Sequence, residues 1–120
     1  MRLTPWRALL LEDAREAAPP EGFVVAADDP IRRVEACPGA PACASASVAT
    51  RPLARALAGR VPGRLHVSGC AKGCAWPRAA GTVLVGREGR FDLVRSGHAW
   101  DTPVRHGLSA AEALTLAGDD

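Results

Sequence analysis

The sequence predicts one small α/β domain, of the α+β kind, in which helices flank a mixed sheet. Its 120 residues are near the commonest size of a single domain. Short apolar runs bounded by Gly, Pro and Asp are typical of strands, and alanine-rich stretches with helical spacing are typical of helices. The chain has two Phe, three Trp and no Tyr. A core of such small side chains gains little buried area and benefits from a support such as a metal centre.

The N-terminal part of the chain predicts extended structure joined by turns. Residues 2–11 form an extended segment, since Pro5 excludes a helix interior there. Residues 12–21, which contain two consecutive prolines, form a connector of short helix or loop. The sequence then predicts a strand at 23–26, a turn at 28–30 and an extended segment at 31–36.

The composition becomes helical between Cys43 and Gly59, where apolar residues fall near helical spacing. Pro52 interrupts this stretch, so we expect a kink or a new start with Thr50 as the N-cap, and Gly59 just beyond the C-terminus. Cys43 is then expected at a helix N-terminus, where the helix dipole favours a thiolate.

The remaining chain predicts a strand, a hairpin and a helix. A short strand at 65–68 precedes the hairpin 82–86 and 90–94, whose turn contains Gly89. Ser109 caps a last helix over 110–117, with Glu112 in the position that completes a capping box.

Charge is distributed unevenly, although the net charge is only +2. From Ala36 to Arg87 there is no Asp or Glu, which predicts an anionic partner, with a solvated basic face as the alternative. Nothing in the sequence predicts nucleic acid or a membrane as a partner. Residues 1–20 lack the apolar run of a signal peptide. The cytoplasm, where thiols stay reduced, is therefore the expected location. The cations of the acid-free stretch are Arg51, Arg55, Arg60, Arg64, Lys72, Arg78 and Arg87.

The four cysteines form two close pairs, Cys37 with Cys43 and Cys70 with Cys74. Each pair spans a glycine-containing turn, in which backbone N–H groups can reach sulfur and tune a metal centre. An iron–sulfur cluster fits best. Structural zinc usually takes pairs spaced C-x2–4-C and fits the C-x5-C pair poorly. Disulfides would need an oxidising compartment. Unligated buried cysteines remain a further alternative.

Both cysteine segments, 36–46 and 68–77, resemble the cluster motifs of the sulfite/nitrite reductase family. Ala-Lys-Gly inside the second pair most resembles the precorrin-3B synthase branch, and residues 2–7 are similar to the strand that closes the preceding ferredoxin-like half. The resemblance implies a nitrite/sulfite reductase-like [4Fe–4S] domain at 21–120, preceded at 1–20 by the tail of that half and a connector. It implies that Cys37, Cys43, Cys70 and Cys74 hold a [4Fe–4S] cluster.

The resemblance also implies a tetrapyrrole, either siroheme bridged to the cluster through Cys74 or a precorrin substrate, and in the latter branch a mononuclear iron. We expect Lys72, which lies between two ligands, to contact this polyanion; a solvated loop lysine is the alternative. Arg2, Arg7 and Arg78 are weaker candidates for its carboxylates. His66 is expected to be structural, His98 and His106 are not assigned, and the three Trp are expected in packing.

Four functions stay open, and one of them is an interaction domain stabilised by zinc. The leading one is a fragment of a precorrin-3B synthase-like oxidoreductase of cobalamin biosynthesis, and the second is a fragment of a siroheme sulfite or nitrite reductase. The third is a non-catalytic electron-transfer or cluster-sensing module. Because family members are several-fold longer, we expect the chain to be a fragment or to work with a second polypeptide. The sequence does not identify the electron donor.

Overall fold

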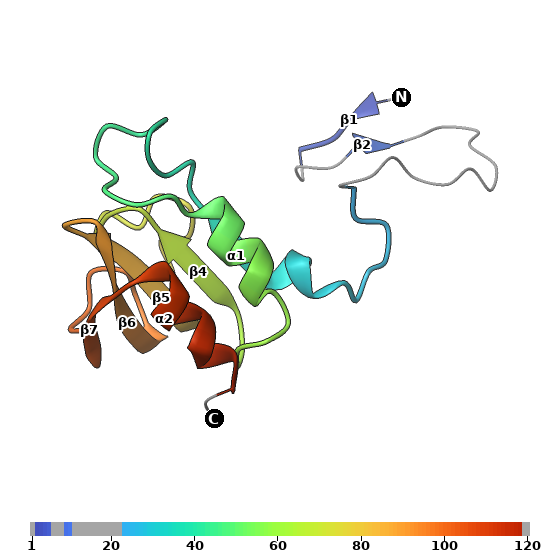
Figure 1. Ribbon diagram of the computed structural model, residues 1–120. Helices are drawn as coiled ribbons and strands as arrows, with labels where there is room; N and C mark the ends of the chain where they lie inside the picture. The colour runs from blue at the N-terminus through green and yellow to red at the C-terminus, as the bar shows by residue number, and fades with distance from the viewer. Residues whose placement is uncertain (1, 6–8, 11–22, 119–120) are drawn as a thin grey trace.

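The computed structural model describes residues 2–5, 9–10 and 23–118. A five-stranded mixed sheet in the order β3-β4-β5-β6-β7 forms the body of the domain, and two helices lie on the viewer's side of it (Figure 1). This confirms the predicted α+β class, although both helices cover the same face of the sheet. Among the described residues, no helix has the length and apolar composition to cross a membrane.

The parallel part of the sheet consists of three strands, β3 (Val34–Ala36), β4 (Leu65–Ser68) and β5 (Ala80–Arg87). Between β3 and β4 the chain passes through α1 (Arg51–Leu57), while residues 69–79 join β4 to β5. Side chains on α1 and Trp76 of the second connection belong to different core clusters. The two connections therefore cover opposite faces of the sheet.

The antiparallel part consists of β5, β6 (Arg90–Gly97) and β7 (Arg105–Leu108). The predicted hairpin is confirmed and is longer than expected. Arg87 pairs with Arg90, so Glu88 and Gly89 alone form the turn. Both have positive φ, 52° and 79°, as a two-residue turn of this kind requires. The strand β7 was not predicted, because its sequence Arg-His-Gly-Leu has no apolar alternation.

The helices begin at the predicted cap residues, Thr50 and Ser109. Helix α1 begins after Thr50, has Pro52 in its first turn, and ends before Gly59, whose φ is +75°. Helix α2 (Ala110–Leu114) has the complete capping box of Ser109 and Glu112. It is shorter than predicted, since the chain tightens into the 3₁₀ helix η2 (Thr115–Gly118).

Three predictions from the N-terminal part are wrong. The stretch 2–11 is not one strand, because β1 (Arg2–Leu3) and β2 (Leu9–Leu10) pair with each other antiparallel. Residues 23–26 form no strand; Phe23 and Val25 are 58% and 75% exposed, and no described strand lies beside this segment. Residues 31–33 belong to the 3₁₀ helix η1 (Pro30–Arg33), which Asp29 caps. The predicted connector at 12–21 lies outside the described residues.

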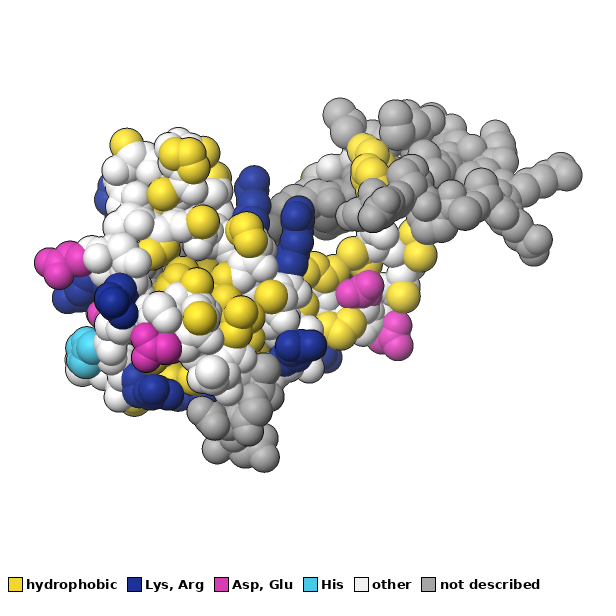
Figure 2. Space-filling model, viewed as in Figure 1, with side chains coloured by type: hydrophobic (Ala, Val, Ile, Leu, Met, Phe, Trp, Pro, Cys, Tyr) yellow, Lys and Arg dark blue, Asp and Glu magenta, His cyan; other side chains and the backbone are white. Residues whose placement is uncertain are grey.

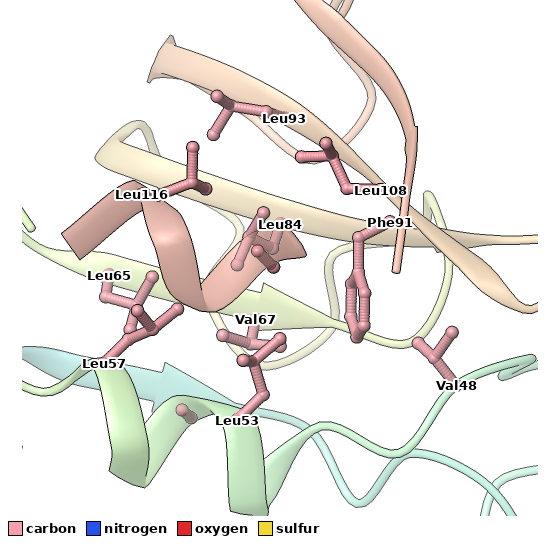
Figure 3. Packing of buried hydrophobic residues seen from close by; sticks show 12 residues of the cluster. Val48, Leu53, Leu57, Leu65, Val67, Leu84, Phe91, Leu93, Leu108 and Leu116 are labelled. Atoms are coloured by element: carbon pink, nitrogen blue, oxygen red, sulfur yellow. The ribbon is translucent and has the colours of Figure 1, made fainter. Parts of the chain in front are cut away.

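The main core lies between the helices and one face of the sheet (Figure 3). Leu57 of α1 and Leu116 of η2 approach the buried strand residues Leu65, Leu84 and Leu93. A second, smaller cluster covers the opposite face, where Trp76 and Ala99 from loops pack on strand residues. This second face has loops as its cover, and one of those loops contains the second cysteine pair. Its strand residues are Ala80, Val83, Val85 and Val94.

Candidate functional site

The two cysteine pairs start from one edge of the sheet. Cys37 directly follows β3, and Cys70 lies two residues beyond the end of β4. These strands are parallel, with Ala36 opposite Val67 in the register, so their carboxyl ends lie together. The fold thereby brings segments 32 residues apart in sequence to adjacent positions.

The two turns touch through Gly69. Its backbone N–H donates to Cys37 Sγ at 3.1 Å, and its carbonyl accepts from the N–H of Ser47 at 3.3 Å. A Cβ at position 69 would lie 2.4 Å from Ala46 Cβ and 3.5 Å from Cys37 Sγ. Glycine is therefore required for the backbones to approach this closely, and a cysteine of the first pair accepts a hydrogen bond from the second segment.

The first turn is fixed by Thr50, which is 1% exposed. Its hydroxyl donates to the carbonyl of Cys37, so it does not bond to the first turn of α1 as an N-cap side chain usually does. Gly39, with φ +68°, leaves room for this side chain, since a Cβ there would lie 2.8 Å from Thr50 Oγ1. The N–H of Cys43 donates to the carbonyl of Gly39 at 2.8 Å.

Cys43 does not lie at a helix N-terminus, contrary to the sequence prediction. It belongs to a series of turns, and helix α1 begins only at Arg51. Pro52 and Thr50 start the helix anew instead of continuing it from Cys43. The helix dipole therefore does not favour a thiolate at this residue.

The second turn is held from both sides. Ser68 Oγ donates to the carbonyl of Cys70 at 2.6 Å, and Gly73 adopts φ +64° between the two cysteines. Lys72 is exposed, and its Nζ donates to Ser45 Oγ of the first segment at 3.2 Å. The ammonium group of Lys72 thus links the two segments, and its contact with a tetrapyrrole stays a prediction.

All four cysteines have free thiols; Cys74 is exposed and the other three are partly exposed. Within residues 2–5, 9–10 and 23–118, no three side chains of His, Cys, Asp or Glu come close enough to hold a single metal ion. A [4Fe–4S] cluster is larger than one ion and takes one thiolate at each iron. Four thiols are the type of donor that such a cluster needs, and the structure places Cys37 Sγ against the second segment through Gly69. The cluster itself remains a prediction.

Both cysteine turns lie in the segment 36–87, which contains no Asp or Glu. The lobe formed by the chain between β3 and α1, at the upper left of the view, shows no acidic side chain in Figure 2. Arg78, a predicted contact for a tetrapyrrole, is exposed, and its guanidinium lies 5.6 Å from the centre of the Trp76 ring. Arg2 belongs to β1, and Arg7 lies outside the described residues.

His66 is buried and structural, as expected. It is fully covered, and neither ring nitrogen has a hydrogen-bond partner among the described residues. Burial lowers the pKa of His66 below its ordinary value, because the charged imidazolium loses its hydration; the Glu35 carboxylate partly offsets this. Glu35, opposite His66 in the sheet, accepts from Arg64 at 3.0 Å, and the Arg64 guanidinium lies 4.3 Å from the centre of the Trp76 ring.

A further group beside the second turn was missed from the sequence. Trp100 was expected in packing but is 53% exposed, and its ring is stacked on that of His98 with centroids 4.7 Å apart. Asp101 Oδ2 accepts from the backbone N–H of His98 at 2.6 Å and lies 3.1 Å from its Nδ1. These hydrogen bonds lower the pKa of Asp101 below its ordinary value. The motif His-Ala-Trp-Asp was the available signal, but spacing alone does not reveal stacking.

No family model matches the chain. One curated relative, a precorrin-3B synthase from Sinorhizobium sp, is 38% identical over 96 residues, which cover 75% of this chain and 21% of the relative. The chain thus spans about a fifth of the length of the curated relative it matches. This finding supports the branch of the family indicated by the second cysteine pair. The chain is therefore related in sequence to one part of a precorrin-3B synthase.

Proposed function

We propose that this chain is the cluster-bearing part of a precorrin-3B synthase-like oxidoreductase of cobalamin biosynthesis, which places a [4Fe–4S] cluster beside a tetrapyrrole. The observation that carries the proposal is the hydrogen bond from Gly69 to Cys37 Sγ, because it joins the two cysteine turns at one edge of the sheet. The sequence relationship to a precorrin-3B synthase supports the choice of substrate class.

The cluster would be held by Cys37, Cys43, Cys70 and Cys74, and when bound it supplies single-electron transfer. The chain's own residues would hold the sulfur atoms in place and donate hydrogen bonds to them. The Gly69 N–H stabilises negative charge on Cys37 Sγ, as N–H···S hydrogen bonds do around such clusters. Thr50 and Ser68 fix the carbonyl groups of Cys37 and Cys70, so that each turn keeps its shape.

The tetrapyrrole would lie against the same edge, where positive charge is not opposed by acids of the segment 36–87. Its peripheral carboxylates are the anions that Lys72 and Arg78 are suited to bind. Both side chains are exposed, and Lys72 Nζ keeps donor capacity beyond its single bond to Ser45, since an ammonium group has three N–H donors. In the much longer relative, other segments would complete the substrate site.

The test asks whether removal of a single thiol abolishes cluster binding. The 120-residue chain is produced and purified without oxygen, and its iron, sulfide and zinc contents are measured together with electron paramagnetic resonance after reduction. We expect equal amounts of iron and sulfide in the wild type. Cys74→Ser is expected to lose the iron and to lower the melting temperature, because metal binding and folding are coupled.

Ala75→Ser is the matched control, since it introduces the same hydroxyl one position further along and removes no thiol. It should retain iron and the wild-type melting temperature. If the wild type contained zinc and no sulfide, the four cysteines would form a structural zinc site and the proposed cluster would be wrong. Unchanged iron in Cys74→Ser would show that Cys74 is no ligand and would overturn the proposed set of four.

A further inference from the structure

The loop after β6 holds an aromatic pair beside the second cysteine turn. Gly73, which lies between Cys70 and Cys74, is the contact point: a Cβ there would lie 3.1 Å from Ala99 Cβ and 3.3 Å from Trp100 Cζ3. A side chain at position 73 would push the indole away from the turn. The close approach of Trp100 to the cysteine turn is thus built into both segments.

Several features hold this loop in one conformation. Ser96 has a positive φ of 48°, which is unusual for a residue other than glycine. Gly97 leaves room for Asp101, since a Cβ at position 97 would lie 2.6 Å from Asp101 Oδ2. Asp101 in turn accepts from His98 N–H and lies within hydrogen-bond distance of His98 Nδ1. Backbone strain and two specific contacts therefore fix the ring of His98.

The outcome of this arrangement is an exposed indole of fixed orientation. The rings of His98 and Trp100 are inclined by only 20°, so the imidazole covers one face of the indole. Trp100 nevertheless keeps 53% of its surface exposed, which is a large apolar area for a residue held so firmly. Trp76, by contrast, is partly buried and packs against the second core cluster.

We propose that the exposed face of Trp100 is a stacking platform for the ring of a tetrapyrrole bound beside the Cys70–Cys74 turn, and that His98 positions the indole. This inference rests on the proposed function and adds to it the residue that contacts the face of the substrate. A tetrapyrrole has an extended unsaturated ring with carboxylates at its periphery. Trp100 offers a flat π surface for the ring, while Lys72, on the same turn as Gly73, offers an ammonium group for a carboxylate.

The test measures binding of uroporphyrin, a stable tetrapyrrole with peripheral carboxylates, to the cluster-loaded 120-residue chain by calorimetry and by the shift of the Soret band. Trp100→Ala is expected to weaken binding about fivefold and to reduce the band shift, as the loss of one stacked aromatic pair predicts. Trp100→Phe keeps a flat ring and should stay close to the wild type. Leu114→Ala is the matched control, because it removes an exposed apolar side chain from α2.

His98 is tested as a positioning residue by two variants. His98→Ala removes the stacked ring and should weaken uroporphyrin binding and increase the rotational freedom of the Trp100 side chain, measured by fluorescence anisotropy with the other two tryptophans replaced by Phe. His98→Phe restores a stacked ring and should restore both values. A structural role alone would change melting temperature without this pattern of rescue.

The outcomes separate the inference from the proposed function. Equal affinities of wild type and Trp100→Ala would overturn the stacking platform and leave the cluster and the tetrapyrrole site standing. Absence of uroporphyrin binding by the wild type would overturn the tetrapyrrole part of both proposals. A third outcome is a wild type that is dimeric and a Trp100→Ala variant that is monomeric with unchanged uroporphyrin affinity. It would identify this face as a contact between copies of the chain and would also overturn the platform.

Discussion

Gly69→Ala is predicted to separate the two cysteine turns and to destabilise the domain. The added Cβ would lie 2.4 Å from Ala46 Cβ, a separation that real Cβ atoms do not adopt, so one of the two backbones must move. Overpacking of a buried contact costs about 1–3 kcal/mol. For a domain of this size each kcal/mol lowers the melting temperature by roughly 4 °C, so the expected decrease is roughly 4–12 °C.

The structure supplies a compensating variant. Ala46→Gly removes the Cβ that collides, and the remaining neighbours, Ala46 Cα at 3.4 Å and Cys37 Sγ at 3.5 Å, are ordinary contacts. The double variant Gly69→Ala with Ala46→Gly should therefore recover most of the melting temperature and of the iron content, apart from the small cost of a new glycine. The four proteins form a double-mutant cycle whose coupling measures the contact.

The assay is thermal unfolding by circular dichroism, with iron and sulfide measured on the same samples. The hydrogen bond to Cys37 Sγ uses the backbone N–H of residue 69, which alanine also has, so the change isolates the approach of the turns. A Gly69→Ala protein with wild-type melting temperature and iron content would refute the reasoning. A double variant no better than Gly69→Ala would show that the collision with Ala46 is not the cause.

Two further predictions concern single side chains. Because burial lowers the pKa of His66, the unfolded chain binds a proton that the folded chain rejects, and the free energy of unfolding should fall as the pH drops below about 6.5, down to the lowered pKa of the folded state. In His66→Leu the free energy of unfolding, measured with urea, should fall less between pH 7.5 and 5.5 than in the wild type. An equal fall would show that other groups cause the pH dependence. Lys72→Ala should weaken uroporphyrin binding roughly two- to fivefold, as an exposed charge contact predicts, and Lys72→Arg should not. Arg60→Ala, at another exposed cation, is the control, and an affinity unchanged by Lys72→Ala would remove the proposed contact.

Much of the fold could be predicted because local signals decide it. Ser109 with Glu112, Thr50 with Pro52, and the Glu88-Gly89 turn each specify their element through neighbouring residues. The exposed segment 23–26 shows the limit of this reasoning. Its β-branched and aromatic residues favour a strand, but a strand also needs a partner, which the described residues do not provide.

The candidate site was predictable in its residue types but not in its contacts. Cysteine spacing and the family resemblance predicted a set of four thiol ligands, which stays a prediction, and parallel strands explain why Cys37 and Cys70 start from the same edge. The role of Gly69 could not be foreseen, since it depends on a side chain 23 positions earlier, Ala46. The exposed stack of Trp100 on His98 likewise depends on tertiary packing against Gly73, which no local pattern encodes.

The uneven cover of the sheet gives the proposed cluster a second consequence, for the solubility of the domain. One face is covered by helices α1 and α2, whereas Val83, Val85 and Val94 are covered by loops that include the second cysteine turn and Trp76. Loss of the proposed cluster would loosen these loops. The apolar strand residues beneath them would then be exposed to other molecules. We therefore expect aggregation of the protein when the cluster-loaded form is exposed to oxygen during purification.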